Sequence, residues 1–274
     1  MKTILFSVLL MFASIAQAQQ PLFDSHLHYG SEDAKHFTPK QIIEIFDRNN
    51  IEYALVSSTI NDGTVALYDY APTRIIPFLG LYRSLREKRD WMWDMSVIPR
   101  VEKELEKGIY RGLGEFHIFA KERKSPVLKQ LVNIAVKRNL MLQVHGDPEV
   151  IDEIFLQAPN ITILWAHLGT KPQSELLRDM LNKYPHNLYI DTSVRDKQLL
   201  ENGSLSKDWQ ELFIDYQNNF MVAVDTFSVN RWNTFDSVVK DMRSWLANLP
   251  PEVAKKLAYD NAYNLLIVPA ETKK

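Results

Sequence analysis

The alternation of short apolar segments with amphipathic segments constrains this sequence more than any other feature. Eight apolar runs of strand length recur along the chain, and each is followed by a stretch whose apolar residues have helical spacing. Runs such as Phe220-Met221-Val222-Ala223-Val224 are apolar on both faces, which is typical of parallel strands covered by helices.

Eight strand–helix units in roughly 250 residues match the size of one (β/α)8 TIM barrel, so we predict an α/β fold with a single barrel domain. An open, doubly wound sheet is the alternative. It is disfavoured because no glycine-rich dinucleotide-binding loop follows the first predicted strand, at 21–28. The charged and aromatic segment from Arg83 to Ser96 is predicted to be either a loop or a short extra helix.

Residues 1–18 have the features of a signal peptide. Lys2 provides the positive start, residues 4–15 are almost wholly apolar, and Ala16-Gln17-Ala18 fits a small-x-small cleavage site. The apolar run is shorter than the ~20 residues that a spanning helix needs. We therefore expect an exported protein, most simply in the bacterial periplasm, with the barrel over residues 19–274 and no membrane contact after cleavage.

Composition excludes several classes of site and partner. The chain has no cysteine, so disulfides, thiolate metal sites and cysteine nucleophiles are absent. The formal net charge is −2 and there is no long basic tract, so no nucleic-acid partner is expected. The expected partner is a small-molecule substrate, and the sequence leaves room for a homo-oligomer.

A histidine pair, His26 and His28, ends the first predicted strand. Residues i and i+2 of a strand point to the same side, so both imidazoles can meet at one metal ion. Such a pair also arises by chance, and the other strand ends are therefore decisive.

Polar side chains recur where the later predicted strands end, and five of the seven histidines lie at strand ends. The carboxyl ends of barrel strands form the active face, so these side chains are expected to share one site. In strand order they are Asp24, His26 and His28, then Glu115 and His117, then His145, then His167, and finally Asp225.

This order resembles the amidohydrolase superfamily of metal-dependent hydrolases. The segments DSHLH, WAHLG and DNAYNLL most resemble its amidohydrolase-2 branch, which also contains metal-dependent decarboxylases and a dicarboxylate lactonase. The resemblance extends over nearly all of residues 19–274. It implies metal ligands at His26, His28, His145, His167 and Asp225.

Glu115 departs from the pattern of superfamily members that carry a carbamylated lysine on strand four. Its segment, Gly-Leu-Gly-Glu-Phe-His, is similar to the Gly-Glu-Ile-Gly segment of TatD-like hydrolases, whose glutamate bridges two metals. The resemblance implies Glu115 as a further ligand, with one or two metals per chain. Two alternatives stay open: Glu115 as a buried acid paired with Arg111 or another cation, and His167 as a proton donor or substrate contact beside a single metal.

Imidazole and carboxylate ligands together favour Zn²⁺, with Mn²⁺, Fe²⁺ or Co²⁺ as alternatives, whereas Ca²⁺ prefers all-oxygen sites. We expect Asp225 to be the catalytic residue that accepts the proton of metal-activated water and passes it to the leaving group. The plain alternative is that Asp225 is a helix N-cap.

Substrate contacts are expected from Arg83, Arg195 and Arg231, which follow three strands on the active face and can bind carboxylate or phosphate. His117 either contacts the substrate or covers the barrel mouth, and Trp232 either lines the pocket or anchors a loop. The predicted substrate is small and anionic.

We therefore predict a metal-dependent hydrolase of amide, lactone or other ester bonds. One alternative is a metal-dependent, non-oxidative decarboxylase, in which an equivalent of Glu115 is not expected to bridge metals. Another is a non-catalytic periplasmic protein that binds a metal or solute. Asp225 argues against the latter, because binding alone needs no catalytic acid.

Overall fold

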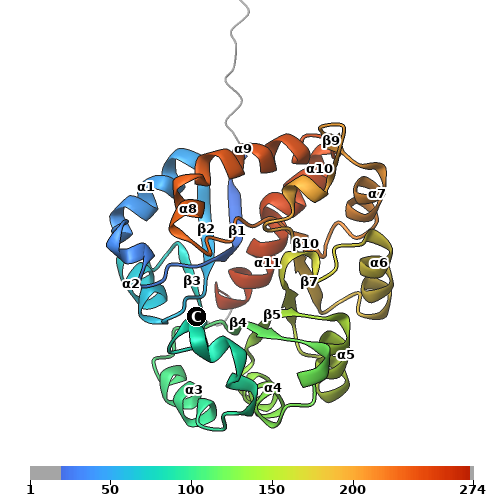
Figure 1. The fold of residues 1–274 in the computed structure, drawn as a ribbon. Coiled ribbons are helices and arrows are strands. Elements are labelled where there is room, and N and C mark those ends of the chain that lie inside the picture. Colours follow the sequence, from blue (N-terminus) through green and yellow to red (C-terminus); the bar gives the residue numbers. More distant parts are fainter. Residues whose placement is uncertain (1–19, 272–274) are drawn as a thin grey trace, which may run out of the picture.

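The computed structural model describes residues 20–271, which form a nearly closed barrel of eight parallel strands surrounded by helices (Figure 1). Each strand pairs with the next one along the chain, which confirms the TIM barrel and excludes the doubly wound sheet. The barrel strands are β1 (Leu22–Leu27), β2 (Ile51–Val56), β3 (Ile75–Leu79), β4 (Gly112–Ile118), β5 (Met141–Gly146), β6 (Ile163–Trp165), β7 (Leu188–Asp191) and β10 (Phe220–Met221).

The helices alternate with the strands and cover the outside of the barrel (Figure 1). The first begins after Thr38, whose side chain accepts from the Gln41 backbone N–H, while the Gln41 side chain accepts from the Thr38 backbone N–H. The helices are α1 (Pro39–Asn49), α2 (Asp62–Tyr70), α3 (Val97–Leu105), α4 (Pro126–Arg138), α5 (Pro148–Gln157), α6 (Ser174–Lys183), α7 (Lys207–Asp215), α8 (Val229–Asn233), α9 (Phe235–Leu246), α10 (Pro251–Lys255), α11 (Asn261–Leu266) and α12 (Val268–Glu271).

The predicted signal peptide, at 1–18, lies outside the described residues. Within residues 20–271, no helix combines the length and the apolar character that a bilayer crossing requires.

The last barrel strand is shorter than the apolar run at 220–224, because the chain leaves the ladder with β7 after Met221 and turns to β1. The Ser25 backbone N–H donates to the Val222 carbonyl at 3.1 Å, and the Asp225 backbone N–H donates to the His26 carbonyl at 2.8 Å. These bonds close the barrel and bring Asp225 beside the histidine pair of β1.

The segment at 83–96 contains two short 3-10 helices, η2 (Leu85–Arg89) and η3 (Trp91–Trp93). Trp91 anchors it over β4, because its buried ring lies 5.5 Å from that of Phe116. Its indole N–H also donates to the His117 carbonyl at 2.9 Å. The segment is therefore held against the strand that carries Glu115.

An apolar cluster fills the barrel interior near the amino ends of the strands. Helix α11, near the end of the chain, covers this end of the barrel with Ala262 and Leu266. The strand residues in the cluster are Phe23, Leu55, Ile76, Phe78, Met141, Leu164 and Met221. The site described next lies at the other end of the same strands.

Asn261 gives the DNAYNLL segment a structural role. Its side-chain amide donates to the carbonyls of Gln217 and Phe220, each at 2.8 Å. We expect Asn261→Ala to lower the free energy of unfolding by about 2 kcal/mol, because two carbonyls lose their partner in a buried setting. Urea unfolding followed by circular dichroism measures the loss.

The matched control is Asn264→Ala, since Asn264 is exposed on the same helix. Equal stability of both variants would contradict the role assigned to Asn261.

Candidate metal centre

The six predicted metal-binding side chains converge at the carboxyl ends of the strands. The ligand atoms of His26, His28 and Asp225 all lie within 4.8 Å of one another. Those of Glu115, His117 and His145 do so as well, so His117 joins the cluster.

Glu115 lies between two pairs of imidazoles. Its Oε1 is 3.1 Å from His145 Nδ1 and 3.0 Å from His167 Nε2. Its Oε2 is 3.5 Å from His28 Nε2 and 3.8 Å from His26 Nε2. One carboxylate oxygen therefore faces each pair, which is the arrangement that a bridging ligand requires.

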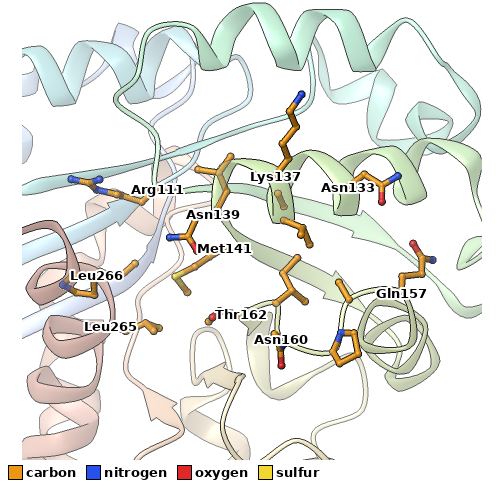
Figure 2. A pocket seen from close by; sticks show the side chains of 17 residues that line it. Arg111, Asn133, Lys137, Asn139, Met141, Gln157, Asn160, Thr162, Leu265 and Leu266 are labelled. Atoms are coloured by element: carbon orange, nitrogen blue, oxygen red, sulfur yellow. The ribbon is translucent and has the colours of Figure 1, made fainter. Parts of the chain in front are cut away.

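The alternative partner of Glu115, Arg111, precedes β4 and lines a cavity at the opposite end of the barrel (Figure 2). That cavity has a volume of about 720 Å³ and lies between α11 and the amino ends of β4 to β6. The cavity contains none of the converging histidines, so it is not the candidate site. Glu115 contacts imidazoles and is not paired with Arg111.

Hydrogen bonds determine which nitrogen His26 and His28 present. His26 Nδ1 bonds to Asp191 Oδ2 at 2.9 Å, and His28 Nδ1 bonds to the Ser57 carbonyl. A carbonyl and an ionised carboxylate only accept, so in the neutral rings both Nδ1 atoms carry the hydrogen. Both Nε2 lone pairs consequently face inward, 3.2 Å apart.

A hydrogen-bond relay through Ser193 determines which nitrogen of His167 faces the site. The Ser193 hydroxyl donates to Asp191 Oδ1, so its oxygen accepts the hydrogen of His167 Nδ1 at 2.7 Å. His167 Nε2 is then left with its lone pair toward Glu115. Asp191 thus orients His26 directly and His167 through one hydroxyl.

With neutral rings, the Nε2 atoms of His26, His28 and His167 are therefore acceptors, like the carboxylate oxygens beside them. Asp225 Oδ1 is buried without a hydrogen-bond partner and lies 3.3 Å from His28 Nε2. Acceptors that face one another repel unless a cation lies between them, and imidazoles with carboxylates suit a divalent transition metal. The donor set fits a divalent metal, without distinguishing one from another.

Asp225 is not the N-cap of the following helix, because Ser228 caps α8 by accepting from the Arg231 backbone N–H. The backbone of Asp225 is instead left-handed, with φ of 55°, as is that of His167, with φ of 62°. Such conformations cost about 1–2 kcal/mol each in residues other than glycine and concentrate at functional sites.

Gly114 lets Glu115 take its place. A Cβ atom at Gly114 would lie 2.2 Å from the Gln143 carbonyl oxygen, and its φ of +122° also favours glycine. A side chain here would push β4 away from β5 and displace Glu115.

The charges of the site shift its pKa values. Burial lowers the pKa of His26, but Asp191, Asp225 and Glu115 raise it well above its ordinary value. Burial raises the pKa of Glu115, but His117 and His26 hold it well below its usual range. The carboxylates therefore stabilise positive charge in this site, either as a proton on His26 or as a bound cation that replaces the proton.

The predicted substrate contacts divide into two groups. Arg83 is exposed and pairs with Glu87, and Trp232 is 1% exposed and stacks on Phe235 at 5.6 Å, so neither is brought into the cluster. His117 lies inside it, with Nε2 at 3.1 Å from Glu115 Oε2.

Arg195 and Arg231 lie at the active face but donate to the chain itself. Arg195 Nε donates to the His167 carbonyl at 3.0 Å. Two nitrogens of Arg231 donate to the Val224 carbonyl at 3.1 and 2.9 Å. Both guanidinium groups therefore support the backbone on which His167 and Asp225 lie.

Sequence reasoning missed Asp191 and Ser193. Asp191 is the last residue of β7 and is fully buried. The run Asp191-Thr192-Ser193 is a polar strand end, which is the same sequence signal that predicts the other residues of the site. Burial raises the pKa of the Asp191 carboxyl, but the charge and hydrogen bond of His26 outweigh this and lower it to about 2.

No family model matches the sequence. A search of characterised proteins also found no match. Solved structures do match. An amidohydrolase from Mycoplasma synoviae has a TM-score of 0.62 at 12% identity, with 89% of this chain and 87% of that chain covered. A TatD-family hydrolase from Entamoeba histolytica has a TM-score of 0.57 at 10% identity, with 90% and 99% covered.

This chain has the fold of amidohydrolases. A further structure with it is a probable 2-pyrone-4,6-dicarboxylic acid hydrolase from Acinetobacter baumannii with citric acid bound, which has a TM-score of 0.55 at 12% identity and coverage of 89% and 98%. The neighbours are thus the kind of protein that the three sequence motifs predicted.

Asp191→Asn tests the orienting role. An amide presents one acceptor where the carboxylate presents two, so either His26 or the Ser193 relay loses its partner. We expect metal affinity to fall about 10- to 100-fold, measured by competition with a chromophoric chelator. Asp179→Asn, on the exposed face of α6, should leave the affinity unchanged. An unaltered affinity in Asp191→Asn would refute the role.

Proposed function

We propose that this protein is a metal-dependent hydrolase that cleaves an amide, lactone or other ester bond of a small anionic substrate. The observation that carries the proposal is the cluster of inward-facing acceptors around Glu115, with the unpartnered Oδ1 of Asp225 at its edge. Such a cluster fits metal binding, and a buried carboxylate oxygen without a partner is available for proton transfer.

The structural neighbours support this proposal. They include amidohydrolases, a TatD-family hydrolase and the probable hydrolase of a pyrone dicarboxylic acid, which was solved with citric acid bound. Those substrates and ligands belong to the neighbours. For this chain they favour hydrolysis of a small molecule that carries a carboxylate.

The ligand residues would be His26, His28, Glu115, His145 and His167, with Asp225. A divalent metal held by them would lower the pKa of bound water to about 7 and polarise the carbonyl group of the substrate. The residues of the chain supply the rest of the chemistry. Asp191, Ser193 and the Ser57 carbonyl hold three imidazoles in the tautomers that bind metal.

Asp225 is placed to handle the proton. Its backbone N–H is held by the His26 carbonyl, while its Oδ1 remains without a hydrogen-bond partner beside His28. In our proposal this oxygen accepts the proton of the attacking water and returns it to the leaving group.

Two finer assignments belong to the same proposal. Zn²⁺ suits the mixed imidazole and carboxylate set, as Mn²⁺, Fe²⁺ and Co²⁺ also do. Export to the periplasm rests on the charged start, apolar run and small-residue motif at 1–18.

The alternatives are less well supported. A decarboxylase is not expected to use Glu115 between two histidine pairs, and a protein that only binds a metal has no need of an unpartnered Asp225 oxygen.

Metal removal tests the hydrolase. Metal-loaded protein should hydrolyse at least one member of a panel of carboxylate-bearing esters, lactones and amides. We expect dialysis against a chelator to reduce the rate at least about 100-fold and added Zn²⁺, Mn²⁺ or Co²⁺ to restore it, because metal chemistry supplies several kcal/mol of the barrier. Initial rates before and after reconstitution measure this.

Asp225→Asn, reloaded to the wild-type metal content, serves as the active-site control. Its kcat should fall about 10²- to 10⁴-fold, since the amide cannot accept the proton. Activity that survives metal removal, or no turnover of the panel by loaded protein, would sink the proposal.

A further inference from the structure

One cation at the mouth of the barrel has no carboxylate partner among residues 20–271. Lys88, a partly buried residue of η2, places its ammonium nitrogen 3.4 Å from His117 Nε2 and 5.7 Å from the centre of the Tyr82 ring. Among residues 20–271, no carboxylate oxygen lies within 4.0 Å of this nitrogen.

His117 does not satisfy Lys88. Its Nε2 also lies 3.1 Å from Glu115 Oε2, and a carboxylate only accepts, so the hydrogen on Nε2 points to Glu115. Lys88 therefore faces a donor. The arginines near this face differ, since Arg195 and Arg231 both donate to backbone carbonyls.

The fold determines where this charge lies. Trp91, three residues after Lys88, is 1% exposed, packs on Phe116 and donates to the His117 carbonyl. The segment that carries Lys88 is thereby attached to the strand that carries Glu115. The ammonium group of Lys88 is thus held beside His117, at the edge of the candidate metal ligands, with no carboxylate partner among residues 20–271.

We infer that Lys88 binds a carboxylate of the substrate, which makes it the residue that selects anionic substrates in the proposed hydrolase reaction. The inference rests on that proposed function. A lysine ammonium is a compact single charge, which one carboxylate neutralises. A doubly charged phosphoryl group would be only half neutralised here and would meet Glu115 and Asp225 in the same site.

Phe119 indicates that the rest of the substrate is apolar. Its ring is 41% exposed and meets the His145 ring edge to face at 6.2 Å. An apolar wall thus adjoins the ligands on one side, and Lys88 adjoins them through His117. A substrate with an apolar body and one carboxylate matches both.

Two unreactive ligands separate recognition from turnover. Glutarate has one carboxylate for the metal-loaded centre and one for Lys88, whereas butyrate has only the first. Titration calorimetry on the Zn²⁺-loaded protein gives both affinities. We expect the glutarate-to-butyrate affinity ratio to fall about 10- to 100-fold in Lys88→Met, as the loss of one charged hydrogen bond predicts.

Arg89→Met is the matched control, because Arg89 is an exposed cation in the same short helix. It should keep the wild-type ratio, and Lys88→Arg should restore much of it. Circular dichroism verifies that each variant is folded. Lys88→Met, unlike Arg89→Met, should also lower the ratio of kcat/KM for 4-carboxyphenyl acetate to that for phenyl acetate, through a higher KM for the carboxylated ester.

An unchanged ratio in Lys88→Met, or no preference for glutarate in the wild type, overturns the inference even if hydrolysis is found. Tighter, Lys88-dependent binding of 3-phosphonopropionate than of glutarate overturns the choice of carboxylate. Lys88-dependent glutarate binding without any hydrolysis would leave the recognition site intact and refute the hydrolase.

Discussion

The candidate site depends on one buried carboxylate that is not itself among the predicted ligands. Asp191 accepts from His26 with one oxygen and from Ser193 with the other, and Ser193 then accepts from His167. This network leaves two Nε2 lone pairs directed at the same place. Without it, each ring could present an N–H instead, and the cluster would contain donors and acceptors in no fixed order.

The barrel makes this network possible by bringing distant segments together. The segment that follows β10 bonds to the backbone of β1, and one of these bonds joins Asp225 to the His26 carbonyl. Left-handed backbone at His167 and Asp225 directs both residues at the site, and the packed barrel compensates its cost of about 1–2 kcal/mol each. The other end of the barrel, covered by α11, contributes stability and no converging histidines.

Much of this could be predicted from the sequence, because the alternation of elements and the polar strand ends are local patterns. Glu115 and the histidines were predicted to share one site because each lies at the end of a predicted strand. Asp191 was missed because its role appears only when the barrel brings the end of β7 within hydrogen-bond reach of His26 on β1. Lys88 was missed for a related reason. Three arginines follow barrel strands and were predicted to bind the anion, but two of them donate to backbone carbonyls, and Trp91 attaches the segment of Lys88 to β4. Tertiary contacts of loops have no local signature.

We propose that Glu115 completes two sets of metal ligands, one with His26 and His28 and one with His145 and His167. Elemental analysis of the purified, metal-saturated chain tests it most directly, with Glu115→Ala as the variant and Glu149→Ala, at an exposed position, as the control. We expect about two metal equivalents per chain in the wild type and control, and about one or fewer in Glu115→Ala. A single equivalent in the wild type that persists in Glu115→Ala would contradict it.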